Sequence, residues 1–151
     1  MTERTVSLHP SSLYDVLIIN SFGHIKLPFG IVLASAGLQV ALYDIDQSKG
    51  ALIERGEMPF LEYDAEPLLQ QVLGKTLHIS TSLEDVAVSN SIVITISTPL
   101  DEYLNPKLLP IFDLINQMSH CLRPHHHIML RSTVYPGTSQ RVYEFLCSRG
   151  L

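Results

Sequence analysis

Residues 21 to 26 read S-F-G-H-I-K and come shortly after an apolar run, Val16–Ile19. A turn between a strand and a helix is where the phosphate-binding pattern G-x-G-x-x-G occurs. Its first glycine allows the tight turn, its second lets the backbone approach a pyrophosphate, and its third allows close helix–strand packing. Only the second glycine is present here, as Gly23. One glycine after a strand is weak evidence for a ligand site, because many such turns only connect a strand to a helix.

A carboxylate at a suitable distance strengthens the interpretation as a dinucleotide site. Asp44 lies 21 residues after Gly23, at the end of the next expected strand. In dinucleotide-binding folds a carboxylate near this separation binds the adenosine ribose hydroxyls, and its charge disfavours the 2′-phosphate of NADP. Asp44 could instead cap the helix expected from Gln47, but Asp46 is better placed for that role. We therefore expect Asp44 to be free for a ligand and the site to prefer NAD over NADP.

Short apolar strands alternate with helices along the chain, which would bring these residues to one edge of a sheet. Strands are expected at 15–20, 38–43, 77–79, 91–97 and 127–131, and helices at 25–36, 47–55, 66–73, 82–88, 106–121 and 138–147. Buried strands with short connections to helices predict a parallel sheet. The expected fold class is α/β, a Rossmann-like doubly wound parallel sheet in three αβα layers with the first strand central. Residues 1–14 are expected to form a loose N-terminal arm, and residues 15–151 a Rossmann-like dinucleotide-binding domain.

Two further segments leave the ends of later strands, on the same expected edge as the turn. They read STPLDEYLNP from Ser97 and RSTVYPGT from Arg131. With them the chain resembles the amino-terminal domain of the nucleotide-sugar dehydrogenases, the group of UDP-glucose 6-dehydrogenase and UDP-N-acetylmannosamine dehydrogenase. TPLDE and STVYPGT match family motifs almost letter for letter, and YDIDQSK and RGEMPFLE match two others. The resemblance covers about residues 15–147 in the family's order.

This resemblance implies an NAD site. The cofactor contacts that it implies are Phe22, Gly23, His24, Ile25, Asp44, Lys49, Ser97, Thr98, Pro99, Ser132 and Thr133. Asp44 and Lys49 correspond to contacts with the adenosine ribose, and Thr98 to a contact from the loop after the fourth strand. Thr133 corresponds to a residue near the nicotinamide that also helps to hold the catalytic water. For Thr98 and Thr133 a purely structural role in a turn is the alternative.

The turn departs from the family pattern at two positions. Ser21 and Lys26 replace the first and third glycines, and Tyr63-Asp64 replaces a proline–glycine pair. A serine is accommodated if its backbone angles permit. Lys26 is expected where helix and strand touch, so its side chain either turns outward and offers an ammonium to the pyrophosphate or pushes the helix away. We favour the second outcome, because an exposed ion pair contributes little.

The resemblance implies oxidation of a sugar C6 alcohol to a carboxylate, with two hydride transfers to NAD. In the family the nucleophilic cysteine, the UDP-sugar site and the dimer helix belong to later domains. We expect this chain to hold the cofactor half of the site and to be inactive alone. Its expected partners are NAD, a UDP-sugar only with those domains, and either a second copy in a homodimer or a separate catalytic-domain chain. The alternative is a degenerate Rossmann module with a regulatory or protein-interaction role and weak or no NAD binding.

Composition and the remaining candidate residues argue against several other partners and sites. The net charge of −5 argues against a nucleic-acid partner, and the apolar run near the start is too short for a membrane span or a signal peptide. Cys121 and Cys147 form no disulfide pattern, which favours the cytoplasm, and both are expected as small core residues on packed helices. The run from His125 to His127 is expected as loop and strand-entry residues, with no metal site, because adjacent residues of an extended segment point to opposite faces.

Overall fold

A computed structural model describes residues 12–98, 102 and 107–151. Its sheet has five strands in the order β3-β2-β1-β4-β5, and every pairing is parallel. The strands are β1 (Tyr14–Ile19), β2 (Val40–Tyr43), β3 (Leu77–Ser80), β4 (Ser89–Ile94) and β5 (His127–Leu130). The doubly wound topology with the first strand central is therefore confirmed. Pro99 and most of the expected N-terminal arm lie outside the described residues.

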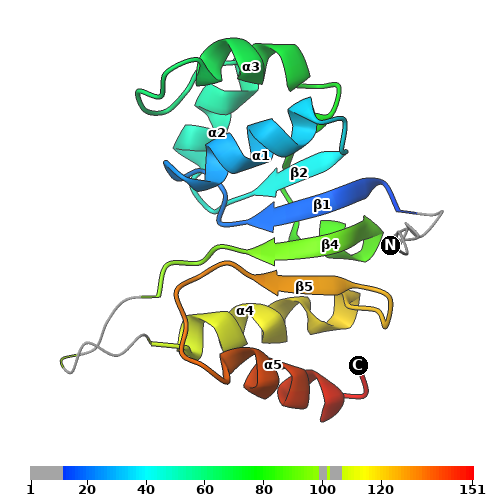
Figure 1. Ribbon diagram of the computed structural model, residues 1–151. Coiled ribbons are helices and arrows are strands. Elements are labelled where there is room, and N and C mark those ends of the chain that lie inside the picture. The colour runs from blue at the N-terminus through cyan, green and yellow to red at the C-terminus, as the bar shows by residue number, and fades with distance from the viewer. Residues whose placement is uncertain (1–11, 99–101, 103–106) are drawn as a thin grey trace, which may run out of the picture.

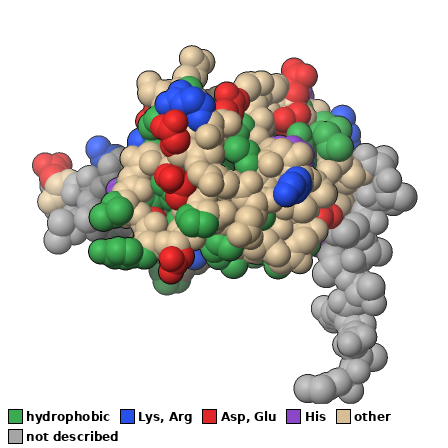
Figure 2. Space-filling model, turned by 90° about the horizontal axis from the view of Figure 1, so that it is seen from above, with side chains coloured by type: hydrophobic (Ala, Val, Ile, Leu, Met, Phe, Trp, Pro, Cys, Tyr) green, Lys and Arg blue, Asp and Glu red, His purple; other side chains and the backbone are tan. Residues whose placement is uncertain are grey.

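Helices cover both faces of this sheet. They are α1 (Lys26–Ser35), α2 (Gln47–Glu54), α3 (Ala65–Val72), α4 (Leu109–Met118) and α5 (Thr138–Cys147), with short 3₁₀ helices η1 (Leu83–Val88) and η2 (Ser119–Cys121). Figure 1 shows α1, α2 and α3 around the β1–β2 half of the sheet, and α4 and α5 beside β5. Seen from above in Figure 2, acidic and basic side chains are interspersed, and the apolar ones form several separate groups on that face.

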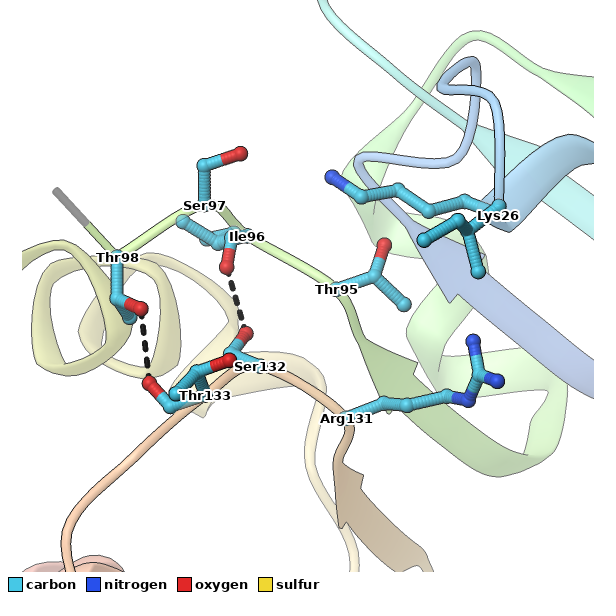
Figure 3. A pocket seen from close by; sticks show the side chains of 9 residues that line it. Lys26, Thr95, Ile96, Ser97, Thr98, Arg131, Ser132 and Thr133 are labelled. Atoms are coloured by element: carbon cyan, nitrogen blue, oxygen red, sulfur yellow. Dashed lines mark hydrogen bonds between the residues drawn. The ribbon is translucent and has the colours of Figure 1, made fainter.

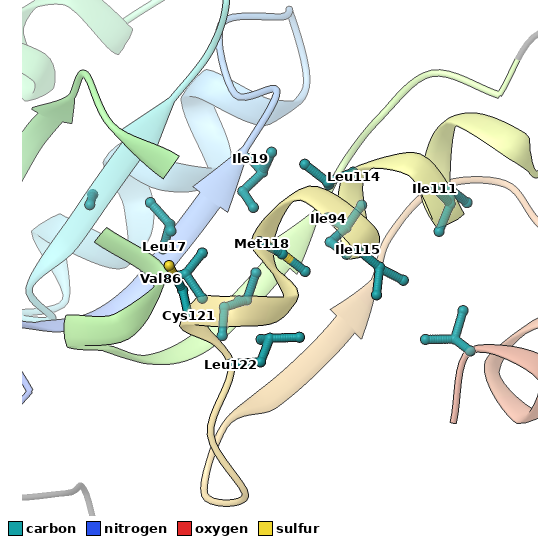
Figure 4. Packing of buried hydrophobic residues seen from close by; sticks show 13 residues of the cluster. Leu17, Ile19, Val86, Ile94, Ile111, Leu114, Ile115, Met118, Cys121 and Leu122 are labelled. Atoms are coloured by element: carbon teal, nitrogen blue, oxygen red, sulfur yellow. The ribbon is translucent and has the colours of Figure 1, made fainter. Parts of the chain in front are cut away.

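Alternating side chains of the central strands point into two separate cores. Leu17 and Ile19 of β1 belong to the same cluster as Ile111 and Ile115 of α4, which Figure 4 shows, whereas Ile18 belongs to a second cluster with residues of α1 and α3. Successive side chains of a strand point to opposite faces, so these clusters lie on opposite sides of the sheet. The three αβα layers are confirmed.

Several local predictions are confirmed and others need correction. Asp46 caps α2, since its carboxylate accepts a hydrogen bond from the Lys49 N–H at 3.1 Å. Gly37 ends α1 with φ = +95°, a conformation that favours glycine. The helix expected at 106–121 is shorter: α4 begins at Leu109, with Pro110 in its first turn, where its missing N–H costs nothing.

The two cysteines have different environments. Cys121 is buried in the core that α4 covers, as expected, but Cys147 is exposed. The prediction for Cys147 was wrong because α5 faces the core along one stripe, in which Thr138 and Val142 are buried and Leu146 is half-buried. Cys147, one residue further on, lies outside that stripe.

His125 and His126 lie in the connection before β5 and His127 begins that strand, which confirms the predicted placement. Within the described ranges no group of three or more side chains is arranged to hold a metal ion. The same ranges contain no helix that is long and apolar enough to span a bilayer.

Candidate functional site

The turn between β1 and α1 closes without the two missing glycines. Asn20 adopts the left-handed backbone conformation in this turn, at φ = +63°, whereas Ser21 has no positive φ. Ser21 is fully buried, and its hydroxyl donates a hydrogen bond to the carbonyl oxygen of Tyr43 at 3.2 Å. The side chain that replaces the first glycine therefore becomes a link between this turn and the end of β2.

Asp44 forms a second link between the same segments. One carboxylate oxygen accepts a hydrogen bond from the Phe22 N–H at 2.9 Å, and the other accepts one from the Asp46 N–H at 3.1 Å. Asp44 therefore also has a structural role, in addition to the ligand contact that is predicted for it. An ionised carboxylate offers about four lone-pair sites, so two backbone donors leave capacity for ligand hydroxyls.

Close packing of α1 on the sheet occurs at Gly30 rather than at Lys26. A Cβ atom on Gly30 would lie 2.7 Å from Cδ2 of Leu42 and 3.3 Å from Cδ1 of Ile18. Lys26 is the first residue of α1, and its aliphatic carbons lie beside Gly23, where a Cβ atom would be 3.4 Å from Cδ of Lys26. Of the two alternatives for Lys26, the structure shows the outward orientation. The favoured one, in which Lys26 holds α1 away from the sheet, was wrong, because α1 approaches the sheet closely at Gly30.

A cavity of about 450 Å³ opens at the carboxyl ends of the strands. Its walls come from the start of α1 and from the loops that follow β4 and β5, as Figure 3 shows. The lining residues are Ile25, Lys26, Thr95, Ile96, Ser97, Thr98, Arg131, Ser132 and Thr133. Five of the expected contact residues thus meet at one place: Ile25, Ser97, Thr98, Ser132 and Thr133.

Two hydrogen bonds fasten the β4 and β5 loops to each other. The Thr98 hydroxyl donates to the carbonyl oxygen of Thr133 at 2.8 Å, and the Ser132 hydroxyl donates to that of Ile96 at 2.6 Å. The structural alternative left open for Thr98 is thus present. Both hydroxyl oxygens can still accept hydrogen bonds, so bracing the loops does not prevent contact with a ligand.

A second cavity of about 340 Å³ adjoins the first, because Ile96 and Ser97 line both. Asp44 and Ile45 line this second cavity, together with residues of α4. The two cavities follow the carboxyl edge of the sheet from the end of β2 to the loop after β5. Their volumes fall within or near the range of small-molecule and cofactor sites.

The first cavity is cationic. Lys26 and Arg131 are the charged residues among those that line it. Burial lowers the pKa of the Lys26 ammonium; the Asp44 carboxylate opposes this effect, and the charge of Lys49 adds to it. The Arg131 guanidinium carbon lies 4.5 Å from the centroid of the Phe29 ring on α1, a cation–π distance.

The other expected contact residues lie elsewhere. The His24 ring stacks on Phe60, with centroids 4.0 Å apart. The Phe22 ring is buried and lines a third cavity, next to α2, that also includes Asp44. Lys49 lines none of these three cavities, and its ammonium lies 3.3 Å from a carboxylate oxygen of Asp46.

Sequence reasoning did not assign Arg131 and Asn20 to the site. The signal for Arg131 was its place directly before Ser132 in the motif, at the end of β5. Asn20 directly follows the first strand, and asparagine tolerates the left-handed conformation better than most residues.

A doubly wound parallel sheet with a crevice beside its central strand, and a carboxylate at the end of the second strand, defines a dinucleotide-binding α/β domain. Comparison of the sequence with known protein families identifies one family within this class. The chain belongs to the UDP-glucose/GDP-mannose dehydrogenase family, whose NAD binding domain matches residues 16–150.

Individual relatives agree with this assignment. The chain is 30% identical over 132 residues to a UDP-glucose 6-dehydrogenase of Pseudomonas aeruginosa, covering 86% of this chain and 29% of that protein. It is 32% identical over 126 residues to an uncharacterized protein of Methanocaldococcus jannaschii, covering 82% and 14%. The structure of UDP-D-ManNAc dehydrogenase from Pyrococcus horikoshii superposes with a TM-score of 0.80 at 28% identity, covering 90% and 33%. The chain therefore spans about a third or less of these proteins.

Proposed function

We propose that this domain holds NAD for oxidation of the C6 alcohol of a UDP-sugar to a carboxylate. The observation that carries the proposal is the pair of joined cavities, with Asp44 in one and the braced loops of Thr98 and Thr133 in the other. NAD would supply the hydride acceptor for this reaction.

The residues present fit a dinucleotide that lies across both cavities. Asp44 would accept hydrogen bonds from the adenosine ribose in the second cavity, with Lys49 nearby to balance charge. The turn at Gly23 would face the pyrophosphate. Ser97, Thr98 and Ser132 would line the nicotinamide end in the first cavity, and Thr133 would hold the catalytic water there. Pro99 stays a predicted contact.

The cysteine chemistry of such an oxidation has no candidate at this site. Cys121 is buried in the core under α4, and Cys147 lies on the exposed side of α5. We propose that this domain alone does not turn over a UDP-sugar. A separate catalytic-domain chain or further domains would supply the nucleophile and the sugar site, in the cytoplasm. A homodimer stays a proposed assembly of this chain, but a second copy adds no new cysteine.

One observation favours the alternative of a degenerate module. The Phe22 N–H, which lies in the turn that would approach the pyrophosphate, donates to Asp44 instead. A regulatory or protein-interaction role with weak or no NAD binding would follow if this bond closed the site.

Calorimetric titration of the purified chain separates the two proposals. With NAD we expect saturable binding, and with NADP much weaker binding, because the Asp44 carboxylate would face the 2′-phosphate. Absence of any NAD binding by a chain whose circular dichroism shows it folded would contradict the cofactor role. Equal affinity for NADP and NAD would mean that Asp44 does not contact the adenosine ribose.

A further inference from the structure

We propose that the Lys26 ammonium binds the pyrophosphate of the dinucleotide, in place of the glycine-rich backbone that this turn lacks. The inference rests on the proposed NAD site and assigns to Lys26 a contact that the family's glycine at this position cannot make. The ligand class is a diphosphate carried by a nucleotide.

The first argument is that one backbone donor of the turn is already engaged and that the Lys26 side chain covers one side of Gly23. The Phe22 N–H is committed to the Asp44 carboxylate at 2.9 Å. The Lys26 side chain lies along Gly23, with Cδ, Cε and Cγ all within 4 Å of the position a Cβ atom would take there. A phosphate that approaches Gly23 from this side therefore meets the lysine side chain before it reaches the backbone.

The second argument is the direction and freedom of the ammonium. In Figure 3 the Lys26 side chain extends across the first cavity toward the loop that holds Ser97. No hydrogen bond or ion pair of this ammonium is found among the residues that the structure describes. The nearby Asp44 carboxylate, which favours the charged form, already accepts two backbone hydrogen bonds.

The third argument is the charge of the cavity. Lys26 and Arg131 are its charged lining residues, and no carboxylate belongs to the described wall. Packing on the Phe29 ring holds the Arg131 guanidinium at the α1 side. Two cations with no carboxylate in the described wall favour an anionic ligand. The start of the first helix is where dinucleotide folds hold the pyrophosphate.

Binding through a side-chain cation differs measurably from binding through neutral backbone amides. A contact between an ammonium and a phosphate is a charge-assisted hydrogen bond that salt screens. We therefore expect NAD affinity to fall with ionic strength, and about tenfold weaker binding at low salt when the charge of Lys26 is removed.

The test titrates NAD into the parent chain, Lys26→Gln, Lys26→Arg and a control, Lys75→Gln, at about 50 mM and about 300 mM NaCl. Lys75 is exposed and lies near the start of β3, at the opposite edge of the sheet. Lys26→Gln should bind NAD about tenfold more weakly at low salt and lose most of the salt dependence. Lys26→Arg and Lys75→Gln should stay close to the parent. Parent-like affinity and salt dependence in Lys26→Gln would overturn the proposal while leaving the NAD site intact.

A parallel titration with inorganic pyrophosphate separates failure of this inference from failure of the proposed function. If the parent binds pyrophosphate but not NAD, and Lys26→Gln loses pyrophosphate, the lysine contact stands and the cofactor role fails. If the parent binds neither ligand, both proposals are overturned. If Lys26→Gln binds pyrophosphate with the affinity of the parent, the proposed lysine contact is wrong, regardless of the result of the NAD titration.

Discussion

The turn between β1 and α1 and the loops after β4 and β5 lie at one cavity but are stabilised in different ways. The turn has lost two motif glycines, and the buried hydroxyl of Ser21 and the carboxylate of Asp44 tie it to the end of β2. The loops keep their motif residues, and the hydroxyls of Thr98 and Ser132 tie them to each other. In the turn a replacement side chain, that of Ser21, acts together with the motif carboxylate of Asp44, whereas in the loops motif side chains alone form the links.

Mutations in the turn and in the loops should have different effects. Changing the turn should affect fold and ligand together, because Asp44 serves both in this account. Changing a loop hydroxyl should remove one brace and leave the sheet beneath it intact. Variants of the turn should therefore have larger effects than variants of the loops.

Asp44→Ala should have the largest effect. It removes the acceptor of two backbone N–H groups and the proposed ribose contact. We expect the free energy of unfolding to fall by about 2 kcal/mol and NAD affinity to fall at least about tenfold. Urea unfolding and calorimetry measure the two quantities.

The matched control for Asp44→Ala is Asp46→Ala, which removes the cap of α2. It should lower the free energy of unfolding by about 1 kcal/mol and leave NAD affinity nearly unchanged. Equal losses of affinity in the two variants would mean that Asp44 acts only through the fold.

Gly30→Ala should destabilise the fold because its Cβ would lie 2.7 Å from Cδ2 of the fully buried Leu42. Overpacking should outweigh the better helix propensity of alanine and lower the free energy of unfolding by about 1 kcal/mol. Val32→Ala, on the same helix at a side chain that is 59% exposed, is the control and should change stability little. A more stable Gly30→Ala chain would show that α1 does not pack as closely as described.

The loop brace should show a smaller and coupled effect. Thr98→Val and Ser132→Ala each remove one hydrogen bond between the loops, and each should cost about 1 kcal/mol or less. Because both bonds join the same two segments, a double-mutant cycle by urea unfolding should show coupling. Strictly additive losses would mean that the two bonds hold separate local turns.

The smallest effect is expected at Cys147, which lies outside both regions. Cys147→Ser should leave stability and NAD affinity unchanged. A maleimide should label Cys147 and spare Cys121, because Cys121 is buried and burial raises the pKa of its thiol. Mass spectrometry of the labelled, folded chain identifies the site. Labelling of Cys121 at a similar rate would contradict the packing of α4.

The order of the elements could be predicted from sequence because it depends on local signals. Apolar runs marked the strands, and Asp46 and Gly37 marked one helix start and one helix end. The bonds of Asp44 could not be predicted in this way, because Phe22 lies 22 residues away and approaches only when β1 and β2 pair. The orientation of Lys26 depends equally on tertiary contacts.

Gly30 was a signal that sequence reasoning did not use. A glycine inside an apolar helix costs about 1 kcal/mol relative to alanine, so its presence often has a packing reason. Here that reason is the contact with Leu42 and Ile18. The exposure of Cys147 depends on which stripe of α5 faces the core, and Cys147 lies one residue beyond that stripe.

The central claim, that NAD lies across both cavities, is tested most directly by ¹H–¹⁵N amide shift mapping. Addition of NAD should shift amides near Asp44 and those of Ser97, Thr98, Ser132 and Thr133. AMP, which lacks the nicotinamide half, should shift the amide signals near Asp44 and leave those of Ser132 and Thr133 unchanged. Shifts by NAD that are confined to one cavity, or that fall mainly on α5 and the far edge of the sheet, would contradict the account.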